Sequence, residues 1–106
     1  MAKRTRVIFF NRLVEGVAGA DYEHWVVDKD YPTARSIPSI ISYEVVRVEG
    51  PLRDQGLDYD YIEIVEVTDI DAYRSDLDAL PGRERFIEEI RSFVGPAEAV
   101  FGTVIE

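Results

Sequence analysis

A chain of 106 residues, of which 46% are hydrophobic and 11% aromatic, is long enough for one domain with a modest core. It has no cysteine, which excludes disulfides, thiolate nucleophiles and thiolate metal sites and favours a cytoplasmic location. The formal net charge of −9 repels phosphate groups, so neither nucleic acid nor an anionic membrane surface is expected as a partner.

The first predicted element is a β-strand over residues 5–14. Its sequence, TRVIFFNRLV, is rich in β-branched and aromatic residues, and apolar side chains fall in both alternation sets, as is typical of a strand covered on both faces. Its apolar run, residues 7–10, is too short for a secretion signal or a membrane span. Asn11 interrupts one face, and an amide buried there needs hydrogen-bond partners.

The segment from Asp21 to Pro38, DYEHWVVDKDYPTARSIP, contains the only Trp and the only His of the chain. Asp21 can cap a helix, which we expect to run to about Asp28 or Lys29. Pro32 disfavours helical geometry at the residue before it. A break is therefore expected at that point, followed by one short turn over residues 33–36.

Two strands, two helical runs and a last short strand complete the chain. Residues 40–49 alternate as a strand, and residues 58–68, DYDYIEIVEVT, show the clearest period of two. A turn-rich loop joins them into a hairpin. Residues 70–80 and 83–94 have apolar side chains at helical spacing, and the tail 99–106 is strand-like. This order predicts an α+β, ferredoxin-like βαββαβ fold, a four-stranded antiparallel sheet with helices on one face.

The predicted strands are apolar on both faces, whereas the helices of such a fold cover only one. A second sheet is the simplest cover for the other face, so we expect a homodimer with two sheets packed together, the dimeric α/β barrel. No internal repeat or linker divides the chain, and residues 1–106 are expected to form a single domain.

A pocket is expected between the sheet and its helices, and Glu63 is its most informative residue. On a strand amid apolar neighbours, this carboxylate either pairs with a cation such as Arg47 or lies in a pocket with a raised pKa. Alternation places several polar and aromatic residues on the same face: Asn11, Tyr43, Tyr59 and Tyr61. A register error of one residue would reverse every direction, and strand tyrosines commonly just pack their rings.

His24 is the second candidate for proton transfer, because histidine ordinarily titrates near neutrality. Asp28 follows it by four residues, so its carboxylate could orient the imidazole, although such helical pairs are common without any function. Catalysis is thus assigned to His24, Asp28 and Glu63. Substrate binding is assigned to the remaining polar and aromatic side chains of the expected pocket: Asn11, Tyr22, Trp25, Tyr31, Arg35, Tyr43, Tyr59 and Tyr61.

No metal or cofactor site is expected. One His without Cys does not make a recognisable ligand set. The glycines form neither GxGxxG nor a P-loop, and there is no GxSxG elbow for a serine hydrolase. Any catalysis is therefore expected to be cofactor-free proton transfer in an aromatic pocket.

Three stretches resemble the RedY/HapK-type proteins, small dimeric α/β barrel proteins of bacterial prodigiosin and bisindole pigment pathways. The resemblance rests on VIFFNRL, on DYEHWVVDKDYPTARSIPSIISYEVVRV and on YDYIEIVEVTDIDAY, and so covers most of residues 6–73. The spacing within DYPTAR is its most specific part. The C-terminal third agrees only at the level of the fold.

The resemblance implies a role in secondary metabolism on an aromatic pyrrole or indole intermediate, without flavin, haem or metal. The leading hypothesis is acid–base catalysis of a cyclisation or condensation. A carrier or chaperone that shields a reactive pyrrole or indole is the alternative from a different class, and a quinone-forming, cofactor-free monooxygenase is the third. Fold membership alone does not choose among them.

Overall fold

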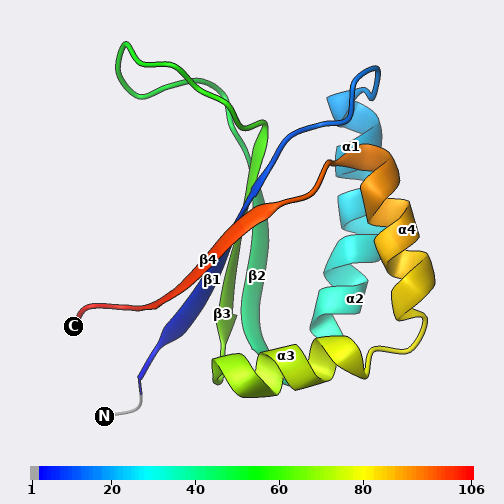
Figure 1. Cartoon of the computed structure of the whole chain (residues 1–106), viewed down its shortest axis with the longest axis vertical. Helices are drawn as coiled ribbons and strands as arrows, with labels where there is room; N and C mark the ends of the chain where they lie inside the picture. The colour runs from blue at the N-terminus through cyan, green and yellow to red at the C-terminus, as the bar shows by residue number, and fades with distance from the viewer. Residues whose placement is uncertain (1–2) are drawn as a thin grey trace.

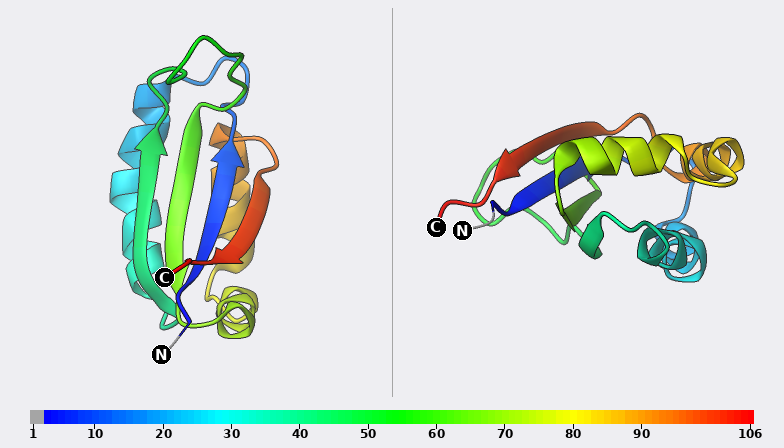
Figure 2. Two further views of the ribbon diagram at one scale, coloured as in Figure 1. Left: turned by 90° about the vertical axis from the view of Figure 1, so that its left-hand side faces the viewer. Right: turned by 90° about the horizontal axis from the view of Figure 1, so that it is seen from below.

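The computed structural model of the chain describes residues 3–106 (Figure 1). Four antiparallel strands form one sheet in the order β2-β3-β1-β4, and the helices lie on one side of it (Figures 1 and 2). The predicted ferredoxin-like α+β fold is confirmed. The elements are β1 (Thr5–Asn11), α1 (Gly19–Trp25), the π-helix η1 (Val26–Asp30), α2 (Tyr31–Arg35), β2 (Ile40–Arg47), β3 (Tyr61–Val67), α3 (Ile70–Asp78), α4 (Arg83–Phe93) and β4 (Glu98–Thr103).

Strand β3 alternates strictly between buried and half-buried residues, as its sequence period predicts. Tyr61, Glu63, Val65 and Val67 form its buried set. In the register with β1, Glu63 lies opposite Phe9, which places this carboxylate on the inner, helix-covered side of the central strand pair. The strand begins at Tyr61 instead of residue 58, and this difference decides the position of Tyr59 described below.

The predicted helix break at Pro32 is wrong. Helical backbone continues from Gly19 through α1, η1 and α2 to Arg35. In η1 the Tyr31 N–H bonds the Val26 carbonyl, five residues back, and Pro32 follows in the first turn of α2, where a missing N–H is tolerated. The change from π to α register accommodates the proline, so one helix spans most of the segment.

The π turn also selects which side chains face inward. Val26, Asp30 and Ala34 are all buried and four residues apart. On a regular α-helix a spacing of four drifts by about 40° at each step, because one turn takes 3.6 residues. The wider π turn reduces this drift, and Asp30 therefore faces the protein interior with 4% of its surface exposed.

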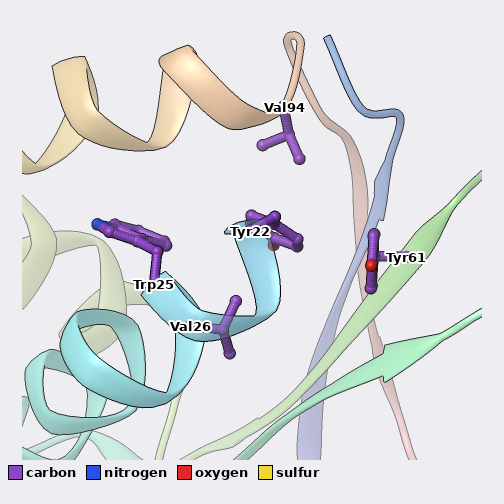
Figure 3. Close-up of a cluster of buried hydrophobic side chains, with 5 residues drawn as sticks. All are labelled: Tyr22, Trp25, Val26, Tyr61 and Val94. Carbon is purple, nitrogen blue, oxygen red and sulfur yellow. The ribbon is translucent and has the colours of Figure 1, made fainter. Parts of the chain in front are cut away.

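Two clusters form the core. Figure 3 shows the first, in which Tyr22 lies between Trp25 and Tyr61. The second cluster joins Val7, Val65, Val67 and Tyr73. Helix α4 packs on the first cluster through Phe86 and Phe93, whose rings lie 5.4 and 5.5 Å from that of Trp25.

The opposite face of the sheet, turned to the viewer in the left panel of Figure 2, is not covered by any helix within residues 3–106. By the strand register it carries a band of half-buried and exposed apolar side chains: Ile8, Phe10, Val46, Ile62, Ile64 and Val100. Within the same described range, no helix is long and apolar enough to cross a membrane.

Trp25→Ala should lower the free energy of unfolding by about 3–5 kcal/mol, because it removes the ring that joins α1 to α4 and leaves a cavity. Urea denaturation followed by circular dichroism measures this loss. Val27→Ala, at a position 66% exposed, is the matched control and should change stability by less than about 0.5 kcal/mol. A similar loss in both variants would contradict the central role of Trp25.

Candidate active site

A pocket of about 450 Å³ lies between the sheet and the helices α2, α3 and α4. The sheet contributes Phe9, Asn11, Tyr43 and Glu63 to its wall, and η1 contributes Asp30. The facing helices contribute mainly apolar side chains. The pocket therefore combines a largely apolar wall with a small polar group on the sheet side.

The polar group is a pair of buried carboxyls bridged by one phenol. The Tyr43 hydroxyl lies 2.6 Å from Asp30 Oδ2 and also hydrogen-bonds Glu63 Oε1. Asn11 Nδ2 donates to the other oxygen of Glu63, Oε2, at 2.5 Å. The single phenol hydrogen can be donated to only one carboxyl, so the second contact needs a proton on a carboxyl oxygen. The three side chains thus hold one shared acidic proton.

The surroundings show which carboxyl holds that proton. Burial, against the opposing hydrogen bond from Tyr43 and with a smaller contribution from the charge of Glu63, raises the pKa of Asp30 to about 7. Burial also raises the pKa of Glu63, but hydrogen bonds from both Tyr43 and Asn11 favour its ionised form. The second hydrogen bond, from Asn11, thus favours Glu63 as the ionised carboxyl of the pair and Asp30 as the protonated one.

Tyr43 itself stays neutral, because burial and the two neighbouring carboxyls raise its pKa well above 10. It can then pass a proton between the carboxyls without holding a charge. A protonated acid and an ionised base, linked by a neutral phenol in a largely apolar pocket, form an arrangement suited to general acid–base catalysis.

Three predicted residues, Asn11, Tyr43 and Glu63, line this pocket. Of the two alternatives for Glu63, the structure favours the pocket with a raised pKa. Arg47 makes two hydrogen bonds to Glu23 instead, at 2.6 and 2.5 Å, and Glu63 has no cationic partner within residues 3–106.

Four other predicted binding residues lie around the pocket or in the core. Tyr22 and Trp25 are buried in the first cluster, and the Tyr61 hydroxyl donates to Glu23 at 2.6 Å. The Tyr31 ring stands edge-on to that of Tyr43, 5.8 Å away, and its hydroxyl accepts the Val45 N–H. These four support the walls and do not line the pocket. Arg35 is exposed, with its guanidinium 6.0 Å from the ring of Tyr31.

His24 and Asp28 are exposed and lie outside the pocket wall. Within residues 3–106 no hydrogen bond or ion pair joins them, because the inward positions of this helix belong to Tyr22, Val26 and Asp30. The expectation that His24 lies over the pocket is corrected accordingly. Across the same described residues, no three His, Asp or Glu side chains gather as a metal-ligand set.

The sequence alternation also predicts the wrong face of the sheet for Tyr59. It precedes β3, its ring lies 5.1 Å from Phe10, a residue of the outer sheet face, and its hydroxyl donates to Glu98 at 2.8 Å. Because residues before Tyr61 leave the strand, the period of two no longer sets the direction of their side chains.

Asp30 was missed by the sequence reasoning. It stands directly before Tyr31-Pro32, where a turn is predicted, whereas the structure has continuous helical backbone there and Asp30 faces inward. The available signal was its spacing of four from the apolar residues Val26 and Ala34.

Comparison with known proteins identifies the family. The model of the REDY-like protein HapK family matches residues 5–105. The chain belongs to the RedY-like HapK family. No curated protein is matched by the sequence.

Solved structures agree with the fold. HapK from Hahella chejuensis is 21% identical, with a TM-score of 0.77 over 95% of this chain and 92% of that one. A dimeric ferredoxin-like protein of unknown function from Thermobifida fusca is 19% identical, with a TM-score of 0.73 over 98% and 93%. SnoaB from Streptomyces nogalater, a cofactor-independent oxygenase, is 24% identical, with a TM-score of 0.70 over 100% and 96%.

The raised pKa of Asp30 predicts a fall in stability as the pH rises. Asp30 ionises near its ordinary value of 3.8 when unfolded and at about 7 when folded, so between these values the folded state binds more protons. The unfolding free energy should decrease over this window, by as much as about 4 kcal/mol at roughly 1.4 kcal/mol per pKa unit.

Asp30→Asn should flatten this decrease, because the amide cannot ionise but still accepts a hydrogen bond from Tyr43. Urea midpoints measured from pH 4 to pH 8 test the effect. Asp28→Asn, an exposed change on the same helix, is the matched control. A slope unchanged by Asp30→Asn would show that Asp30 is not the buried acid.

Proposed function

We propose that this protein acts in secondary metabolism as a cofactor-independent catalyst that cyclises or condenses an aromatic pyrrole or indole intermediate in the cytoplasm. The observation that carries the proposal is the Asp30–Tyr43–Glu63 cluster, with its one shared proton. Family membership supports the biosynthetic role. The pocket volume of about 450 Å³ suits a small aromatic molecule.

The proposed step forms a carbon–carbon bond between a ring carbon and a carbonyl carbon. Asp30 gives its proton to the carbonyl oxygen, and Glu63 takes the proton that leaves the ring carbon as aromaticity returns. Tyr43 then passes the proton from Glu63 back to Asp30, so the cluster ends in its starting state. The step consumes no oxidant, reductant or metal.

A specific observation favours each of two further functions. The largely apolar pocket would also serve a carrier that shields a reactive pyrrole or indole and leaves it unchanged. The likeness to SnoaB favours a cofactor-free oxygenase that forms a quinone from a phenolic substrate. These functions differ in a measurable product: unchanged ligand for the carrier, and consumed oxygen for the oxygenase.

Proton transfer can be tested without the natural substrate. In D₂O the protein should accelerate exchange of the methylene protons of 1-(indol-3-yl)propan-2-one, followed by ¹H NMR, because Glu63 can remove the proton while Asp30 protonates the carbonyl. Asp30→Asn, Tyr43→Phe and Glu63→Gln should each lower the rate about 100-fold or more.

His24→Ala is the matched control, since this residue is exposed and outside the pocket wall. It should keep the rate, and a loss equal to that of Glu63→Gln would return the catalytic role to His24. Binding of the ketone without exchange would favour the carrier. Oxygen uptake with an added phenolic substrate would favour the oxygenase.

We further propose that two copies pair through the uncovered sheet face. The band that includes Ile8, Ile64 and Val100 is apolar and has no helix over it within the described chain, and a second sheet would remove it from water. The description of the similar Thermobifida fusca protein as dimeric supports this arrangement.

Light scattering at micromolar concentration should give twice the chain mass of 12.1 kDa. Ile8→Glu should shift the protein to the monomer, because it places a charge in the middle of the proposed interface. Val27→Glu, which adds the same charge at an exposed helix position, should stay dimeric. A wild-type monomer would overturn the proposed pairing.

A further inference from the structure

Helix α4 turns a single face towards the pocket. The pocket-lining positions of this helix and its C-cap residue follow the spacing of one helical stripe: Arg83, Phe86, Ile87, Ile90, Arg91 and Val94. Two positions of this otherwise apolar stripe are arginines. They stand eight residues apart, roughly 12 Å along the helix, so one cation lies towards each end of the stripe.

Neither arginine has an acidic partner within residues 3–106. Of the other eight arginines, five form ion pairs there (Arg4, Arg6, Arg12, Arg47 and Arg74), and Arg35, Arg53 and Arg85 do not. Acidic residues outnumber basic ones by 21 to 12, so partners are abundant. Position distinguishes Arg83 and Arg91 from the other three: both are exposed, and both line this pocket.

These cations do not serve the carboxyl cluster. The pKa of Asp30 is set by burial, by Tyr43 and by Glu63, and that of Glu63 by burial, Tyr43 and Asn11. No arginine contributes to either. The positive charge of this helix face is therefore available to something that enters the pocket.

We propose that the ligand is an aromatic carboxylic acid, whose ring lies on the apolar stripe of α4 and whose carboxylate is bound by Arg83 or Arg91. The planar guanidinium matches a carboxylate through two parallel hydrogen bonds. Such an anchor would orient the ring over the Asp30–Tyr43–Glu63 cluster on the opposite wall. This inference rests on the proposed function, because it assumes that an aromatic molecule occupies this pocket.

The test compares indole-2-carboxylate with indole-2-carboxamide, a neutral probe of the same shape, by titration calorimetry at pH 7.5. The carboxylate should bind about tenfold more tightly, as expected for a charge-assisted hydrogen bond. The double variant Arg83→Gln/Arg91→Gln should abolish this preference and leave the carboxamide affinity unchanged. The two single variants identify which arginine holds the acid.

Arg85→Gln is the matched control, because Arg85 lies on the same helix and is exposed outside this pocket. It should keep the tenfold preference, and circular dichroism melts show whether each variant is folded. Equal binding of both probes by the wild type would overturn the inference and leave the proposed function standing. If neither probe binds, both proposals fail for this class of ligand.

Discussion

One proton shared among Asp30, Tyr43 and Glu63 is the interaction on which the site depends. These residues come from η1, β2 and β3, so the cluster exists only while the helical segment is packed on the sheet. Two ionised carboxylates in this apolar setting would be strongly unfavourable, because burial penalises each charge and they repel one another. Protonation of Asp30 removes one charge, and the Asn11 amide satisfies the other. The fold therefore holds a protonated acid and an ionised base next to each other.

The pocket above this cluster is open because α4 packs mainly against another helix. Phe86 and Phe93 contact Trp25, and the helix leaves its Arg83–Val94 stripe facing the sheet across the cavity. The two core clusters, one around Tyr22 and one around Val65, hold the architecture. Phe86, Ile90 and Val94 both line the pocket and pack in the first core cluster, so a change in this part of the pocket wall should also affect stability.

The sequence patterns predict the sheet better than the site. The period of two in residues 61–67 correctly directs Glu63 inward, since alternation is enforced by the pleat wherever a strand is paired. It fails at Tyr59, which lies outside the paired region. On the helical segment, the spacing of four from Val26 indicates an inward direction for Asp30, but the break predicted before Pro32 hides this signal. The apolar stripe of α4 is evident from its helical spacing, whereas its position across the pocket from the sheet depends on tertiary packing.

Because His24 is exposed and outside the pocket wall, acid–base chemistry in the pocket would have to use other side chains. A side chain that titrates near neutrality is still present, because burial raises the pKa of Asp30 to about 7, into the range that histidine ordinarily supplies. The carboxyl acid differs from an imidazolium in one respect: its proton-donating form is neutral. A neutral acid adds no positive charge beside Glu63, and a positive charge there would lower the pKa of Glu63. Glu63 therefore keeps its raised pKa, and with it its basicity, while a protonated acid lies next to it. Two buried carboxyls in an apolar pocket can in this way supply both the proton donor and the proton acceptor that two histidines could otherwise provide.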